Sequence, residues 1–110
     1  MTNSLGEKIR RLRKEQKLTL DKLAELSGSS KSYIWELENK NPPRPSAEKL
    51  TKIAEVLGVT IEYLLDEKQA ITEEDAVDAQ FYREYKHMDP DTKEKIREMV
   101  KLWGTPGRPS

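Results

Sequence analysis

The stretch TLDKLAELSGSSKSYIWELEN, residues 19–39, decides the fold of this chain. Its apolar residues recur at the three- and four-residue spacing of a helix, first over roughly 20–26 and again over roughly 31–39. Gly28 stands between the two runs and breaks the helical pattern. We therefore predict two short helices joined by a tight turn.

Residues with capping side chains support both helix starts. Thr19 and Ser30 each precede a helical run, where a hydroxyl can accept a hydrogen bond from an unpaired amide of the first turn. Two short helices joined by a glycine turn are typical of a helix-turn-helix motif. Ala24 then falls where the two helices touch and only a small side chain fits. We expect the inward-facing set to be Leu20, Leu23, Ala24, Leu26, Ile34 and Leu37.

Three further helices are expected around this motif. One precedes it, over roughly 5–16. Three prolines within residues 41–45 exclude a helix there, because proline lacks a backbone donor. Beyond them, Ser46 begins a helix that Gly58 ends, and Thr60 opens a short fifth one. The apolar residues expected to be buried in these last two helices are Ala47, Leu50, Ile53, Ala54, Leu57, Ile61, Leu64 and Leu65.

Two longer helices are expected near the C-terminus. After an acidic linker, Thr72 begins an approximate capping box for a helix over roughly 73–87. Asp89 and Pro90 have the order of an N-cap and a first helical residue, which predicts a last helix over roughly 90–103. Each helix carries an apolar stripe, consisting of Val77, Phe81, Tyr85 and Met88 in the first and Ile96, Met99, Val100 and Trp103 in the second.

The composition excludes several classes of protein. The 110 residues contain 20 basic and 20 acidic side chains and no cysteine, which excludes disulfides, thiolate metal sites and cysteine nucleophiles. The net charge is zero, yet the N-terminal edge is basic, because Lys and Arg dominate residues 1–17. No apolar run is long enough to cross a membrane, and the N-terminus lacks the apolar segment of a signal peptide. We expect a soluble, cytoplasmic protein.

Residues 5–65 resemble the Cro and phage-lambda-repressor-like family, also called the XRE family, in every helix and in the glycine turn. The resemblance implies an all-α chain. Residues 1–66 would form a five-helix lambda-repressor-like DNA-binding domain, and residues 67–110 a C-terminal two-helix extension with a flexible tail, for dimerisation or partner binding.

The same resemblance implies specific DNA contacts. The second helix of the motif would lie in the major groove, with base contacts from Lys31, Ser32 and Glu36. Chemically, lysine can donate to guanine, serine can serve either kind of base, and glutamate can accept from cytosine. The family's phosphate contacts fall on Thr19, Tyr33, Asn39 and Arg44, and Trp35 either stacks on the sugar-phosphate backbone or packs on the first helix. The alternative is that Lys31, Ser32 and Glu36 form an ordinary solvated helix face.

Arg13 and Glu38 match an ion pair that, in similar proteins, ties the first helix to the recognition helix. We expect this pair to be partly buried; the alternative is a weak surface bridge. The chain departs from the family at Leu20, where a phosphate-binding glutamine is common, and at Ser27 and Ser29, where larger packing residues are common. The departures predict a lost phosphate contact and slightly looser packing of the motif.

The expected function is sequence-specific binding of double-stranded DNA as a homodimer on a palindromic operator, most simply for transcriptional repression. The C-terminal stripes would form the dimer interface or bind a regulatory protein partner, as in a DNA-binding antitoxin or a phage-type repressor. A third reading is an adaptor that has kept the fold without DNA binding. Nothing indicates an enzyme, a cofactor or a metal site, since no nucleophile–base pair or metal-ligand spacing occurs and His87 is the only histidine. The protein would associate with the nucleoid through DNA, without a membrane.

Overall fold

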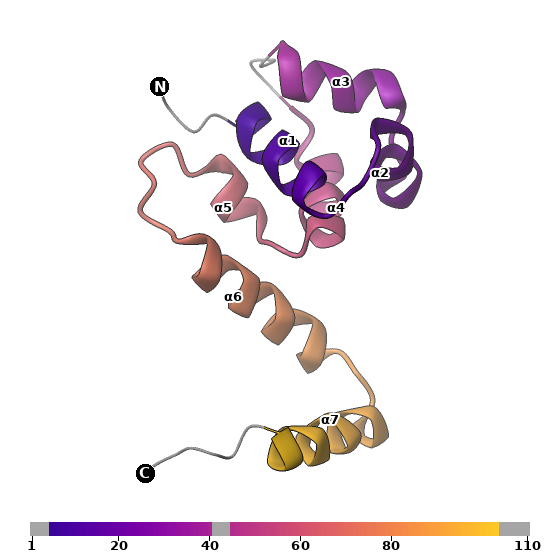
Figure 1. The fold of residues 1–110 in the computed structure, drawn as a ribbon, viewed down its shortest axis with the longest axis vertical. Helices are drawn as coiled ribbons and strands as arrows, with labels where there is room; N and C mark the ends of the chain where they lie inside the picture. Colours follow the sequence, from indigo (N-terminus) through magenta and orange to yellow (C-terminus); the bar gives the residue numbers. More distant parts are fainter. Residues whose placement is uncertain (1–4, 41–44, 104–110) are drawn as a thin grey trace. The chain divides into compact units, whose positions relative to one another are not determined.

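The computed structural model describes residues 5–40 and 45–103, and all the regular structure in those ranges is helical (Figure 1). The expected all-α fold is therefore confirmed. The expectations for the proline-rich segment 41–44, which includes Arg44, and for the tail 104–110 lie outside the described residues. The helices are α1 Leu5–Glu15, α2 Leu20–Ser27, α3 Lys31–Asn39, α4 Ala47–Leu57, α5 Ile61–Leu65, α6 Glu73–Lys86 and α7 Pro90–Trp103.

Helix ends lie where the capping residues predicted them. The Thr19 hydroxyl accepts the Lys22 amide at 3.0 Å, and the Ser30 hydroxyl accepts the Tyr33 amide at 3.0 Å. Ser46 and Thr60 cap α4 and α5 in the same way. Gly28 ends α2 with a φ of 71°, a left-handed conformation that side chains with a Cβ rarely adopt.

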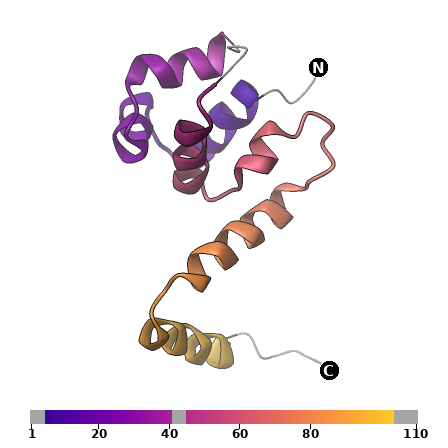
Figure 2. The same ribbon diagram turned by 180° about the vertical axis from the view of Figure 1, so that it is seen from behind.

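The first five helices enclose one apolar core. In both views α1 lies between α3 and α5 (Figure 1, Figure 2), and α3 packs against both α1 and α2. The core includes Ile9, Leu12, Leu23, Ala24, Ile34, Leu37, Leu50, Ile53, Ala54, Leu57, Val59, Tyr63 and Leu64. The prediction of a buried helix-turn-helix interface is confirmed at Leu23, Ala24, Ile34 and Leu37.

Three expected core residues are exposed instead, and one of them is Ala47, the first residue of α4, which lies outside the buried set of that helix. Leu26 and Leu65 are about half exposed, at 51% and 49%. On α2 the buried residues are Leu23, Ala24 and Ser27, at helical spacing, and Leu26 lies off that face. On α5 the buried residues are Tyr63 and Leu64, which leaves Leu65 outside the core. The expectations for Leu26 and Leu65 were wrong because a helix of one or two turns fixes its inward face poorly by pattern alone.

The described residues form two compact units that divide between Gln80 and Phe81. The first unit extends past residue 66, because Ile71 packs against the core and Ala76 and Gln80 on α6 are buried. The functional division into 1–66 and 67–110 stays a prediction. The second unit contains the end of α6 and the whole of α7, which Asp89 caps by accepting the Thr92 amide at 2.7 Å.

None of the described helices is long and apolar enough to span a membrane. The same residues hold no cluster of three or more histidine and acidic side chains that would suit a metal ion.

Candidate nucleic-acid interface

Helix α3 presents a polar face to solvent and an apolar face to the core. Ile34 and Leu37 are fully buried, which fixes the helix against α1 and α2. On the opposite side a shallow groove is lined by Lys31, Ser32, Trp35 and Glu36. The three residues expected to contact bases therefore lie together on one exposed surface, at the N-terminal part of the helix.

Lys31 already has a partner on that surface. Its ammonium lies 3.7 Å from a carboxylate oxygen of Asp21, and both side chains are more than half exposed. An exposed pair at this distance is weak, because water and salt screen it. Lys31 is thus free to exchange Asp21 for another acceptor.

Two of the expected phosphate-binding hydroxyls keep a proton to donate. The Thr19 hydroxyl accepts the Lys22 amide, and the Tyr33 hydroxyl accepts the Ser46 amide at 3.1 Å. Because each oxygen is used as an acceptor, its own proton can point to an outside acceptor such as a phosphate. The ammonium of Lys49 lies 4.7 Å from the centre of the Tyr33 ring, which adds positive charge at this position.

Trp35 and Asn39 lie one turn apart on the exposed side of α3. The Trp35 ring is 44% exposed, and the Lys40 ammonium lies 5.6 Å from the ring centre. The Asn39 amide donates to the Trp35 carbonyl at 2.9 Å and accepts a hydrogen bond from Arg10. Asn39 is therefore held by the protein at both ends of its side chain.

The ion pair between Arg13 and Glu38 joins α1 to α3. Arg13 donates from Nε to one Glu38 oxygen at 2.7 Å and from Nη2 to the other at 3.0 Å. Both side chains are almost buried, and Arg13 also donates to the Leu18 carbonyl at 2.9 Å. The hydrogen bonds to Glu38 raise the pKa of Arg13 above its ordinary value. This geometry is that of a buried two-pronged pair rather than of a weak surface bridge.

Lys8 is a structural cation that the sequence analysis missed. Its ammonium is buried and donates to the carbonyls of Tyr63 and Asp66, at 2.7 and 2.8 Å, at the C-terminal end of α5. Burial lowers the pKa of Lys8, and the negative charge of Asp66 opposes that change. Its position was readable, because Lys8 falls at helical spacing on the stripe of Leu5, Ile9 and Leu12.

Gly6 is a second structurally important residue that the sequence analysis missed. A Cβ added to Gly6 would lie 2.5 Å from the Leu37 carbonyl oxygen and 2.7 Å from that of Glu38. Only glycine therefore lets the start of α1 approach the end of α3 this closely.

Arg11 joins α1 to two other helices. It donates to Glu73 of α6 at 2.8 Å and to the Tyr63 hydroxyl of α5 at 2.9 Å.

Sequence comparison agrees with this geometry. Residues 9–64 match the sequence profile of the helix-turn-helix family. The HTH-type transcriptional regulator SinR of Bacillus subtilis is 35% identical over 77 residues, which cover 70% of this chain and 69% of SinR.

The chain belongs to the lambda-repressor-like helix-turn-helix family. Another relative is the immunity repressor protein of Bacillus phage phi105, 36% identical over 73 residues, which are 66% of this chain and 50% of the phage protein.

Solved structures of similar proteins include complexes with DNA. SinR, the master regulator for biofilm formation, in complex with DNA superposes with a TM-score of 0.53 and 39% identity, over 56% of this chain and 98% of that one. The P22 c2 repressor with a synthetic operator gives 0.54 and 30% identity, over 58% and 96%. A SinR/SinI complex extends over 89% of this chain and 95% of the matched one, with a TM-score of 0.56 and 29% identity.

The departures of this helix-turn-helix protein from the family pattern have different structural consequences. Ser27 is buried and donates to the Leu23 carbonyl at 2.7 Å, so its hydroxyl is satisfied within α2. The hydroxyl oxygen of Ser29 is buried and makes no hydrogen bond. Leu20 packs against the core, partly buried. Of the three positions, only Ser29 leaves a polar atom unsatisfied.

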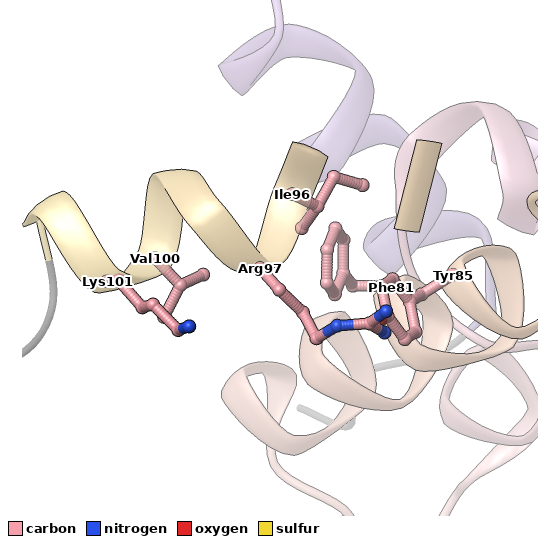
Figure 3. Close-up of a pocket in the computed structure, with 6 residues that line it drawn as sticks. All are labelled: Phe81, Tyr85, Ile96, Arg97, Val100 and Lys101. Atoms are coloured by element: carbon pink, nitrogen blue, oxygen red, sulfur yellow. The ribbon is translucent and has the colours of Figure 1, made fainter. Parts of the chain in front are cut away.

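The apolar stripes of α6 and α7 meet in the second unit. Figure 3 shows Ile96 and Val100 of α7 with Phe81 and Tyr85 of α6 around an open apolar pocket, and Arg97 extending toward Tyr85. Arg97 donates to the Tyr85 hydroxyl at 2.6 Å. The groove continues to Met99 and Trp103, both of which are mostly exposed. The unit thus leaves a large apolar surface in contact with solvent.

Proposed function

We propose that this protein is a sequence-specific DNA-binding transcriptional repressor that binds a palindromic operator as a homodimer. The observation that carries the proposal is the exposed polar face of α3, formed by Lys31, Ser32 and Glu36 on a helix whose other face is locked into the core. A rigid helix with donors and an acceptor on its outer face can read base edges in the major groove.

Each of the three residues has a distinct role in the proposal. Lys31 donates to guanine O6 or N7 after leaving Asp21, and Ser32 pairs with an adjacent base edge. Glu36 accepts from a cytosine amino group and repels acceptors at the same position, which disfavours wrong sequences.

Phosphate contacts supply affinity and orientation. Thr19 and Tyr33 donate their free hydroxyl protons, and the exposed Trp35 ring lies against the sugar-phosphate backbone. Arg44 adds a further cation, as its match to the family implies. Thr19 also stands at the N-terminus of α2, where unpaired amides favour an anion.

The apolar surface of α6 and α7 is the proposed dimer interface. A second copy of the chain would cover the stripe residues Val77, Phe81, Tyr85, Met88, Ile96, Met99, Val100 and Trp103. Exposed apolar surfaces of this kind are costly in water and mark interaction sites. A palindromic operator requires that two copies related by a twofold axis present their α3 helices about one DNA turn apart.

Repression then follows from occupancy of the operator by the dimer. A dimer bound across a promoter blocks polymerase sterically, with no cofactor and no catalytic step, in the cytoplasm and on nucleoid DNA. The relatives named as a regulator and an immunity repressor support this function over that of an antitoxin. SinR has been solved together with SinI, so a regulatory protein that competes for the apolar surface is compatible with the proposal.

Selection from a pool of random duplexes, followed by sequencing, tests the proposal. We expect enrichment of an inverted repeat whose half-sites are centred about one helical turn apart. Enrichment of a single half-site would contradict the dimer. The absence of any enrichment at low salt, with protein shown to be folded by circular dichroism, would contradict DNA binding and favour an adaptor.

A further inference from the structure

Both ends of the exposed Asn39 amide are held by hydrogen bonds within the protein. Its Nδ2 donates to the Trp35 carbonyl at 2.9 Å, and its Oδ1 accepts a hydrogen bond from a guanidinium nitrogen of Arg10. The two partners also fix the orientation of the amide, since a carbonyl needs a donor and a guanidinium needs an acceptor. One amide hydrogen of Asn39 is left over, whereas Arg10 brings a full positive charge and several unused donors to the same place.

The charges at this end of α3 do not cancel. Arg13 takes both oxygens of Glu38 in the buried pair, whereas Arg10 lies 3.6 Å from one of them. Two guanidinium groups thus share one carboxylate, which leaves one positive charge in excess. The Arg13 side chain is 11% exposed and that of Arg10 is 45% exposed, so the excess charge lies on Arg10.

Arg10 is held beside the face of α3 that would read DNA. Asn39 follows Trp35 by one turn, and Trp35 lines the same groove as Ser32. The carbonyls at the C-terminal end of a helix carry partial negative charge, which repels phosphate. An arginine attached there reverses the sign of the local charge. The bond to Asn39 uses one of the five N–H donors of the guanidinium, so donors remain for a phosphate oxygen.

We propose that Arg10 contacts a backbone phosphate beside the C-terminal end of α3, and that Asn39 positions Arg10 instead of binding the phosphate itself. The proposal rests on the proposed DNA binding and differs from the role that the family resemblance implied for Asn39. The phosphate contact expected from Asn39 is made instead by Arg10 of α1, which Asn39 holds in place.

The test measures affinity for the selected duplex as a function of salt concentration. Removing one contact between a cationic side chain and a phosphate reduces the magnitude of the slope of log K against log salt by about 0.9. We therefore expect Arg10→Gln to lower the slope by about that amount and to weaken binding roughly tenfold at moderate salt, equally for all sequences. Arg10→Lys keeps the charge and should keep the slope. Lys68→Gln, which removes an exposed cation between α5 and α6, is the matched control and should change neither value.

A double-mutant cycle tests the role of Asn39. Asn39→Ala should weaken DNA binding in the wild-type protein but have no further effect in the Arg10→Gln variant, because its action passes through Arg10. The inference is overturned if wild-type protein binds its duplex and Arg10→Gln leaves the slope unchanged. It is equally overturned if Asn39→Ala weakens binding by the same factor in both backgrounds. Failure of folded wild-type protein to bind any duplex would instead overturn the proposed function, and this inference with it.

Discussion

The side chain of Ser29 lowers the stability of the folded protein. Its hydroxyl oxygen is buried without a hydrogen-bond partner, and burying such a group costs roughly 1–3 kcal/mol. We expect Ser29→Ala to raise the free energy of unfolding by about 1 kcal/mol in urea denaturation. Ser27→Ala is the matched control, because the Ser27 hydroxyl donates to the Leu23 carbonyl. Equal stabilisation by both substitutions would show that the unsatisfied hydroxyl of Ser29 is not the cause.

Arg13 and Glu38 act on orientation more than on stability. A buried pair with two short hydrogen bonds costs desolvation energy that its attraction roughly repays. Its distinct effect is geometric, because it fixes the end of α3 relative to α1. In the proposed complex, that angle would decide where Lys31 and Ser32 lie in the major groove.

At the scale of helices, Gly6 allows α1 to pack closely against α3. In an open helix position, replacing glycine by alanine stabilises by about 1 kcal/mol. At Gly6 the new Cβ would meet two backbone carbonyl oxygens of α3 at 2.5 and 2.7 Å, and neither can move without shifting the helix. We therefore expect Gly6→Ala to destabilise the protein by about 1–3 kcal/mol in thermal or urea unfolding. Lys14→Ala, on the exposed side of α1, should be close to neutral, and a stabilised Gly6→Ala protein would disprove the close contact.

Helix α7 depends on the charge of its N-cap. Hydrogen bonds from the Thr92 side chain and backbone amide lower the pKa of Asp89. A lowered pKa in the folded state means that the cap's stabilisation is present above the ordinary aspartate pKa, about 3.9, and is lost as pH falls through the folded value. We expect amide protection in the first turn of α7 to fall over that acidic window, as measured by NMR hydrogen exchange. Asp89→Ser keeps a cap without a carboxylate, so a pH response that survives in this variant would exclude Asp89 as the cause.

The sequence predicts helix ends better than helix faces. Thr19 and Ser30 cap with hydroxyls that accept amides three residues away, and Gly28 ends α2 through its own backbone, so local sequence is enough to predict these ends. Leu26 was wrongly placed inside, because which side of a two-turn helix is buried depends on its neighbours in space.

The contacts between helices were the least predictable part of the candidate interface. The shared exposed surface of Lys31, Ser32 and Glu36 could be predicted, because all three lie on one helix and match a family pattern. The bond between Arg10 and Asn39 joins residues from different helices, and nothing local to either residue signals it. The tight fit of Gly6 is invisible in sequence for the same reason.

At the scale of the whole molecule, the proposed binding of a palindromic operator requires a dimer, formed through the second unit. Val100 lines the apolar groove and is 59% exposed. We expect Val100→Asp to convert a dimer into a monomer in light scattering after gel filtration, because a buried unpaired carboxylate is costly. Leu102→Asp on the same helix is the control, since Leu102 does not line the groove. A dimer that withstands Val100→Asp would move the interface elsewhere.

The central claim is that the exposed face of α3 reads base sequence. Selection of random duplexes should be run in parallel with wild-type protein and with Lys31→Ala, and the base preference compared position by position. We expect Lys31→Ala to lose preference at one base pair in each half-site and to keep it at the others. An unchanged preference at every position, in Lys31→Ala and equally in Ser32→Ala and Glu36→Ala, would contradict it.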